Sequence, residues 1–204
     1  MLKRVFDITA CLFSIPLIIP VLAIAAIVIK FDSRGPVLYR GWRTGLGGKP
    51  FLMYKFRTMV INAEKTGGPS TAFNDPRLTS IGRFLRKYKI DELPQLINIL
   101  RGEMSFVGPR PQVKRYTKLY TDAEQVILSV RPGLTDYASI RFINLDQILG
   151  DDAVDEKYFN EIEPEKNKLR VKYAMNNSVI IDIKIVAITF VQMLNLRCKW
   201  NIED

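Results

Sequence analysis

The feature that most constrains this chain is an uncharged apolar run of 20 residues from Ala10 to Ile29, ACLFSIPLIIPVLAIAAIVI. As a straight helix it would extend about 30 Å, which matches the thickness of a bilayer's hydrocarbon core. Basic residues flank the run on both sides, with Lys3 and Arg4 before it and Lys30 directly after it. The run therefore predicts a membrane segment whose orientation depends on these flanks.

Three interpretations compete for this run. A secretory signal would use Lys3 and Arg4 as its basic flank and be cut after Ala25, but Asp7 interrupts that flank and the apolar run continues beyond the cut. A spanning helix would place one basic flank outside the cell, against the preference of short basic segments for the cytoplasm. A segment that enters and leaves by the same face keeps both flanks inside.

The prolines favour this third interpretation. Pro16 and Pro20 lack an N–H, so the carbonyls of Leu12 and Pro16 lose their helical donors and the segment should bend sharply. In lipid, the hydroxyl of Ser14 is a candidate donor to a nearby backbone carbonyl. We expect residues 1–30 to form a broken, re-entrant membrane helix with its break at Ser14 and Pro16. An ordinary kinked spanning helix is the alternative.

The amino-acid composition excludes several classes of reaction and metal site. The chain holds no histidine, which excludes Ser-His-Asp and Cys-His mechanisms and His-containing zinc sites. Cys11 and Cys198 do not form the pattern of a disulfide scaffold or a thiolate zinc site. Any reaction must use carboxylates, cations or a metal bound through oxygen.

The basic side chains are concentrated in the first part of the chain. Residues 1–118 carry 20 basic and 7 acidic side chains, whereas residues 119–204 carry 10 and 14. A basic surface of this kind attracts nucleic acid, anionic lipid or a phosphorylated substrate. A merely solvated basic surface is the alternative interpretation.

Short apolar runs separated by glycine and proline follow the membrane segment. They predict brief strands at 36–39 and 50–56, joined by a hairpin turn at 45–49. The small, polar residues 62–74 predict a mobile loop. Farther on, the acidic region 146–165 predicts a linker. The apolar stretch that follows, 179–196, is interrupted by charges and predicts a packing helix, not a second membrane span.

Helical periodicity is clear between 79 and 100. A first apolar stripe lies on one helix face, with most of the cations on the opposite face. This pattern predicts a helix that lies on a lipid surface or has a solvated face. This stripe consists of Ile81, Phe84, Leu85 and Tyr88. A second stripe begins just after Asp91-Glu92. Because Pro94 is acceptable only in a first turn, this pair should lie beside a helix start, where amide dipoles favour negative charge.

Asp91 and Glu92 are adjacent carboxylates within a basic region. The surrounding cations are Arg77, Arg83, Arg86, Lys87, Lys89, Arg101 and Arg110. The two acids could simply be salt-bridged. The alternative is a phosphate site, with arginines for the oxygens and carboxylates for a magnesium ion and for attack on phosphorus. Proline on both sides of Arg110 makes a stiff loop that presents one guanidinium.

These residues belong to several longer motifs that resemble the bacterial sugar transferases, specifically the monotopic polyprenyl-phosphate phosphoglycosyl transferases in their small form. The matching segments are KRVFD at 3–7, the apolar helix with Ser14 and Pro16, GPV at 35–37, KFRTM at 55–59, DPRLT at 75–79, IGRFLRK at 81–87, DELPQL at 91–96 and GEMSFVGPRP at 102–111. RPGLT at 131–135 and residues 178–185 match more loosely. Two departures are Ile15, which separates Ser14 from Pro16, and DYASI at 136–140, where many relatives carry Gly-Trp-Ala-Gln.

The resemblance implies transfer of a phosphosugar from a nucleotide sugar, usually a UDP-sugar, to undecaprenyl phosphate, giving undecaprenyl-diphosphosugar and UMP. It implies that Asp91 is the nucleophile and forms a covalent phosphosugar intermediate, and that Glu92 helps to hold Mg²⁺, with Asp91 as a second candidate ligand. Neither step requires a general base, because both attacking groups are anions. Candidate substrate-binding residues are Lys55, Arg57, Arg86, Pro109, Arg110 and Pro111.

The fold we expect is α+β and mostly helical: a re-entrant membrane helix at 1–30, and a compact cytoplasmic catalytic domain at 31–204 with interfacial amphipathic helices and short strands. The protein would act at the cytoplasmic face of the bacterial inner membrane, at the start of capsule, O-antigen or other glycoconjugate assembly. Besides its substrates and the bilayer, partners to test are downstream glycosyltransferases and a second copy of the chain; we expect no nucleic acid. The competing hypothesis is a membrane-anchored, non-enzymatic protein that binds anionic lipid or nucleic acid.

Overall fold

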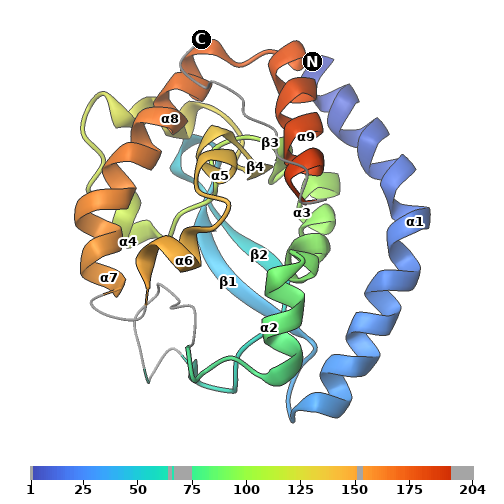
Figure 1. The fold of residues 1–204 in the computed structure, drawn as a ribbon. Helices are drawn as coiled ribbons and strands as arrows, with labels where there is room; N and C mark the ends of the chain where they lie inside the picture. Colours follow the sequence, from blue (N-terminus) through green and yellow to red (C-terminus); the bar gives the residue numbers. More distant parts are fainter. Residues whose placement is uncertain (1, 64–65, 67–74, 151–153, 194–204) are drawn as a thin grey trace.

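A computed structural model describes residues 2–63, 66, 75–150 and 154–193 (Figure 1). The chain is mostly helical with a few short strands, which confirms that part of the expected fold. In chain order the elements are α1 (Leu2–Asp32), β1 (Leu38–Thr44), η1 (Leu46–Gly48), β2 (Pro50–Phe56), α2 (Ser80–Lys87), η3 (Ile90–Gln95), α3 (Leu96–Arg101), β3 (Ser105–Val107), α4 (Lys114–Thr117), η4 (Glu124–Ser129), β4 (Gly133–Thr135), α5 (Tyr137–Arg141), α6 (Leu145–Leu149), α7 (Val154–Lys157), η5 (Tyr158–Ile162), α8 (Glu163–Asn176) and α9 (Val179–Met193).

The first helix, α1, continues through both of its prolines. It is helical from Leu2 to Asp32, and Figure 1 shows it bowed along one side of the molecule. Ser14 Oγ donates to the carbonyl of Ala10 at 2.7 Å, the kind of backbone contact expected for this hydroxyl. The expected break at Ser14 and Pro16 is therefore corrected to a continuous, curved helix. Each proline removes only one backbone donor, so helical bonding resumes on both sides.

Much of the surface of α1 is apolar and exposed. Exposed side chains include Leu12, Phe13, Leu17, Ile24, Ile27 and Phe31, whereas Cys11, Ala25 and Ile29 are buried against the rest of the protein. Among the described residues, α1 is the helix long and apolar enough to cross a membrane. An exposed apolar surface of this extent is typical of one that contacts lipid. The helix therefore supports membrane association.

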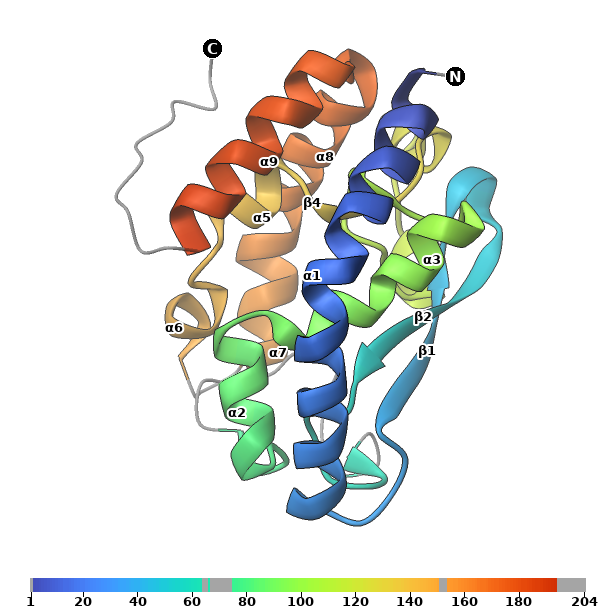
Figure 2. The ribbon, with the colours of Figure 1, turned by 90° about the vertical axis from the view of Figure 1, so that its right-hand side faces the viewer.

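The buried side of α1 packs on β2, α2 and α3. Cys11 lies in a cluster with Phe51 of β2 and Ile99 of α3. Farther along the helix, Ile29 lies in a second cluster with Leu85 of α2. Figure 2 shows α1 running across the face of the molecule next to α2 and α3. The apolar helix α1 therefore packs against α2 and α3, the elements on either side of η3, which carries Asp91 and Glu92.

Two small sheets support the loops of the protein. β1 and β2 form an antiparallel hairpin whose register runs from Leu38 opposite Phe56 to Thr44 opposite Pro50, and this confirms the predicted hairpin turn. β3 and β4 pair in parallel, with Val107 opposite Thr135. The second sheet brings together segments that are far apart in the sequence.

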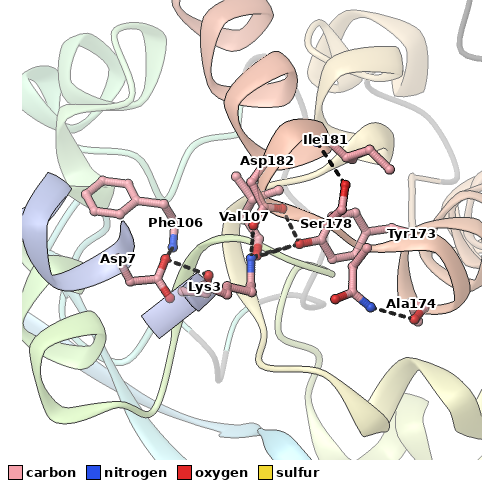
Figure 3. Close-up of polar contacts among 11 residues, drawn as sticks. Lys3, Asp7, Phe106, Val107, Tyr173, Ala174, Ser178, Ile181 and Asp182 are labelled. Carbon is pink, nitrogen blue, oxygen red and sulfur yellow. Dashed lines mark hydrogen bonds and ion pairs between the residues drawn. The ribbon is translucent and has the colours of Figure 1, made fainter. Parts of the chain in front are cut away.

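A polar network ties the start of α1 to β3, α8 and α9 (Figure 3). Lys3 Nζ lies 2.5 Å from Asp182 Oδ2 of α9 and donates to Tyr173 Oη at 3.0 Å and to the carbonyl of Val107 at 2.9 Å. Asp7 accepts from the backbone N–H of Phe106 at 3.0 Å. Because Asp182 is fully buried, α9 packs through its charged residue, which confirms the predicted packing helix over Val179–Met193.

Two other predictions concern the acidic region 146–165 and the polar region 62–74. The acidic region predicted as a linker is largely helical, because it contains α6, α7, η5 and the start of α8. Most of the predicted mobile loop at 62–74 lies outside the described residues, as do residues 194–196 of the apolar stretch and Cys198.

Candidate active site

The Asp91-Glu92 pair lies at the beginning of η3, one turn before α3. Lys89, just before η3, has a φ of 56° in the left-handed region, so the chain turns sharply between α2 and η3. Pro94 lies inside η3, two residues before α3 begins at Leu96, so its missing N–H falls ahead of the α-helix. The predicted position of the acidic pair beside a helix start is confirmed.

Asn98 holds α3 against β2. Its Oδ1 accepts from the backbone N–H of Tyr54 at 3.0 Å, and its Nδ2 donates to the carbonyl of Leu52 at 2.7 Å. Asn98 is fully buried, so these bonds form in a dry environment where they fix orientation strongly. They place Lys55 of β2 beside Glu92. Nothing in the sequence points to Asn98, since a polar residue on an apolar helix face gives no sign of its partner.

Glu92 is paired with two cations. Lys55 Nζ lies 3.1 Å from Glu92 Oε1. Arg110 binds both carboxylate oxygens, with Nη1 donating to Oε2 at 2.9 Å and Nη2 to Oε1. Burial alone would raise the pKa of Glu92, but Arg110 and Lys55 hold it well below its usual value. Glu92 is therefore a carboxylate that stays ionised and keeps two cations in place.

Asp91 has a different environment. Its side chain is buried, and its Oδ1 accepts no hydrogen bond from any part of the chain that the structure describes. Burial raises the pKa of Asp91 and the charge of Glu92 adds to the increase, while Lys55, Arg86 and Arg110 oppose it. The salt-bridge interpretation thus explains Glu92 but not Asp91. An unpaired buried carboxylate oxygen beside several cations is an arrangement that functional sites tend to contain.

Arg110 is presented by a tightly packed loop after β3. Pro109 and Pro111 are buried on either side of it. The backbones of Gly108 and Gly133 approach so closely that a Cβ on Gly108 would lie 2.2 Å from the carbonyl oxygen of Arg131. Only glycine permits this approach, which fixes the path of the chain into the loop. The predicted stiff loop is therefore present, and its guanidinium points to Glu92.

Asp136 supports the same loop from α5. Its Oδ2 accepts from the backbone N–H of Arg110 at 3.3 Å, and its Oδ1 caps α5 by accepting from the N–H of Ser139 at 2.7 Å. Asp136 is fully buried. The sequence carried one usable sign of it, since aspartate before a short helical segment is a common N-cap.

Arg86 and Arg57, two further predicted substrate-binding residues, lie in different parts of the structure. Arg86 of α2 acts on Asp91, because its charge helps to lower the pKa of that carboxyl. Arg57 is not brought to this cluster. Its guanidinium donates to the carbonyls of Ser33 at 2.7 Å and Arg34 at 2.9 Å, so it caps the carboxyl end of α1. A single residue, Phe56, separates Arg57 from Lys55, but a short distance in sequence does not decide where a long side chain points.

Asp91 and Glu92 could supply some, but not all, of the ligands that a magnesium ion requires. Among the described residues there is no group of three or more acidic or other metal-binding side chains that could hold an ion. Mg²⁺ in phosphate-transfer sites is commonly bound by one or two carboxylates plus substrate oxygens and water. The free Oδ1 of Asp91 is suited to such a bond. Glu92 can contribute only by releasing part of its contact with Lys55 or Arg110.

Comparison with known proteins agrees with this site. The bacterial sugar transferase family model matches residues 1–196. The uncharacterized sugar transferase EpsL of Bacillus subtilis is 38% identical over 95% of this chain and 87% of its own length. Exopolysaccharide production protein PSS of Rhizobium leguminosarum is 36% identical over 95% of both chains.

A third relative has a named activity. The UDP-glucose:undecaprenyl-phosphate glucose-1-phosphate transferase of Escherichia coli is 37% identical over 93% of this chain, which spans 39% of that longer protein. The family match and the relatives cover the helix α1, the acidic pair and the Arg110 loop together. The chain therefore belongs to the bacterial sugar transferase family.

Proposed function

We propose that this protein transfers a sugar phosphate from a UDP-sugar to undecaprenyl phosphate and thereby starts the assembly of a bacterial surface glycan or glycoconjugate. Relatives named for this reaction support the substrate classes. The observation that carries the proposal is the contrast between the two adjacent carboxylates. Glu92 is saturated by cations, whereas buried Asp91 keeps a free oxygen among them.

In the first step, an Asp91 carboxylate oxygen forms a bond to the β-phosphorus of the UDP-sugar. The bond between that phosphorus and the bridging oxygen breaks, and the bridging oxygen leaves with UMP and its electron pair. The product on the protein is an acyl phosphosugar. No proton is transferred, so the lack of histidine is no obstacle.

In the second step, a phosphate oxygen of undecaprenyl phosphate forms a bond to the same phosphorus. The bond from that phosphorus to the Asp91 oxygen breaks, which restores the carboxylate and gives undecaprenyl-diphosphosugar. The attacking lipid phosphate is already an anion, so this step also needs no base. One nucleophile thus serves both half-reactions, as in a ping-pong mechanism.

The cations around Asp91 provide the charge stabilisation that phosphoryl transfer requires. Arg110 and Lys55 are held at the site by Glu92, and Arg86 acts on Asp91 from α2. A bound Mg²⁺, held through Asp91 and Glu92, would neutralise further charge on the diphosphate. Arg86 is the cation we assign to the lipid phosphate, and Arg110 the one for the nucleotide.

The same proposal places the protein at the cytoplasmic face of the inner membrane. The apolar exposed surface of α1 supports contact with lipid, and the basic flanks of α1 support a re-entrant path that leaves both ends on one side. The site would then face the headgroup of its lipid substrate.

The test is UMP release by the purified full chain with Mg²⁺, undecaprenyl phosphate and a panel of UDP-sugars. Asp91→Asn should abolish release, whereas Asp122→Asn, which changes an exposed aspartate, should leave it unchanged. Incubation with a UDP-sugar labelled in its sugar should leave the label on wild-type protein and not on Asp91→Asn. Turnover by Asp91→Asn at the wild-type rate would refute the assigned nucleophile. A folded wild-type protein that is silent with every donor but binds anionic vesicles would favour the non-enzymatic alternative.

A further inference from the structure

Asp136, just before α5, is a fully buried carboxylate whose two oxygens bond two different backbone N–H groups. Oδ1 accepts from Ser139 at 2.7 Å and caps α5, whereas Oδ2 accepts from Arg110 at 3.3 Å. No cation of the described residues lies within ion-pair distance of this carboxylate. Asp136 belongs to the segment 136–140, where the sequence departs from the pattern of many relatives. Its role is therefore sought in its own contacts.

Capping of α5 does not by itself require a carboxylate at this position. Serine and asparagine cap a helix start about as well as aspartate does, and each uses one uncharged oxygen. A buried charge, by contrast, lowers stability unless hydrogen bonds and neighbouring charges compensate it. The second oxygen of Asp136 therefore needs an explanation beyond the cap, and its contact is the backbone N–H of Arg110.

Arg110 carries the single backbone N–H of the loop 109–111, because the prolines on both sides of it have none. Backbone hydrogen bonds hold the chain before and after this loop; they join Pro109 to Gly133 at 3.1 Å and Gln112 to Thr44 at 2.9 Å. The N–H of Arg110, in contrast, is held by the side chain of Asp136. The orientation of the central peptide of the loop therefore depends on Asp136.

The other end of Arg110 is held at the acidic pair. Its guanidinium bonds both oxygens of Glu92, with Nη1 2.9 Å from Oε2. Glu92 raises the pKa of Arg110 most strongly; burial opposes this increase, and the charges of Asp91 and Asp136 add to it. Asp136 thus acts on Arg110 both through its backbone N–H and through its charge. A guanidinium that is fixed at both ends is already oriented before a ligand arrives, which reduces the entropic cost of binding.

We propose that Asp136 is a positioning residue for the donor nucleotide, which holds the backbone of Arg110 so that the guanidinium meets the diphosphate in one orientation. This inference rests on the proposed function, in which Arg110 binds the nucleotide. Asp136 acts through Arg110 and not by contact with the substrate. Loss of its second oxygen should therefore weaken binding of the UDP-sugar and of UMP. Binding of the lipid phosphate, which we assign to Arg86, should not change.

The experiment measures the affinity for UMP by calorimetry in the full chain in detergent, for Asp136→Asn, Arg110→Met and the double variant. Asparagine keeps an oxygen for the cap, but its NH₂ group cannot accept from the N–H of Arg110. Asp136→Asn should weaken UMP binding about tenfold or more and raise KM for the UDP-sugar, because a small displacement of a binding group is costly. KM for undecaprenyl phosphate should be unchanged. In the Arg110→Met background, Asp136→Asn should change UMP affinity by less than about twofold, because the side chain that Asp136 positions is absent.

Ser178→Ala is the matched control for the loss of a helix cap. Ser178 Oγ accepts from the N–H of Ile181 at the start of α9, so the substitution removes a cap from a different helix. It should lower the melting temperature and keep the wild-type affinity for UMP. Asp136→Ser is a second test variant, since serine can cap α5 but its side chain is too short to bond Arg110 as well. It should reproduce the weakened UMP binding of Asp136→Asn, so the inference can be tested even when one variant fails to fold.

Two results would overturn the inference while leaving the proposed function intact. The first is wild-type affinity for UMP in a folded Asp136→Asn or Asp136→Ser protein. The second is a loss of UMP affinity on Asp136→Asn that is equally large with and without the Arg110 side chain, because Asp136 would then act independently of Arg110. A wild-type protein that neither binds UMP nor releases it would refute both the inference and the proposed function.

Discussion

The two adjacent carboxylates should respond in opposite ways to neutralisation. Glu92→Gln removes the counter-charge of Lys55 and Arg110 and leaves both cations unpaired. Breaking a buried ion pair costs about 3–5 kcal/mol, and we expect about 2–3 kcal/mol here because the Arg110 side chain is 36% exposed and partly hydrated. For a chain of this size, that loss lowers the melting temperature by about 4–12 °C.

Asp91→Asn should instead stabilise the protein. The pKa of Asp91 is raised mainly by burial, so its ionised form is less stable in the folded protein than in the unfolded chain. Asparagine keeps the shape and removes the charge, although one buried polar atom remains unpaired. We therefore expect a higher melting temperature than that of the wild type, in a variant that transfers no sugar phosphate.

Thermal unfolding followed by circular dichroism in detergent, from pH 3 to pH 8, measures both effects. The pKa of Glu92 is lowered by folding, so its contribution is present above the usual glutamate pKa and is lost as the pH falls through the lower folded value. Asp91→Asn stabilises the protein because it removes a charge that burial makes unfavourable. This stabilisation should be present at neutral pH and disappear below the usual aspartate pKa, where wild-type Asp91 is protonated in both the folded and the unfolded state. Melting temperatures that shift in the same direction in both variants would refute the reasoning.

Three further predictions follow from particular contacts. Asp182→Asn should lower the free energy of unfolding by about 3 kcal/mol, measured by urea titration, because it leaves Lys3 without its buried partner; an unchanged midpoint would contradict that role. Arg57→Met should lower the melting temperature without changing the KM for the UDP-sugar, because its guanidinium bonds the end of α1; a raised KM would instead support substrate binding. UMP release should decline on acidification through the raised pKa of Asp91, and a rate that stays flat to the usual aspartate pKa would show that this carboxyl is not the nucleophile.

The sequence alone determined the local features of this protein. The apolar run predicted the membrane helix, the glycines at 45–48 predicted the hairpin turn, and Pro94 placed the acidic pair beside a helix start. The motifs from 3 to 111 indicated the family. Each of these depends on residues that are neighbours in the chain, where backbone sterics, missing donors and hydrophobic periodicity act directly.

Only the tertiary structure decided which side chains meet. Arg57 and Lys55 are two residues apart in sequence, yet Lys55 reaches Glu92 while Arg57 reaches the end of α1. Asp136 lies far from the acidic pair in sequence, and it bonds the backbone of Arg110 because β4 pairs with β3 and brings the start of α5 to the Arg110 loop. The pKa values of Asp91 and Glu92 diverge for the same reason. Burial and partner charges belong to positions in space, and a long flexible side chain can satisfy them in several directions, so their outcome is set only when distant segments pack together.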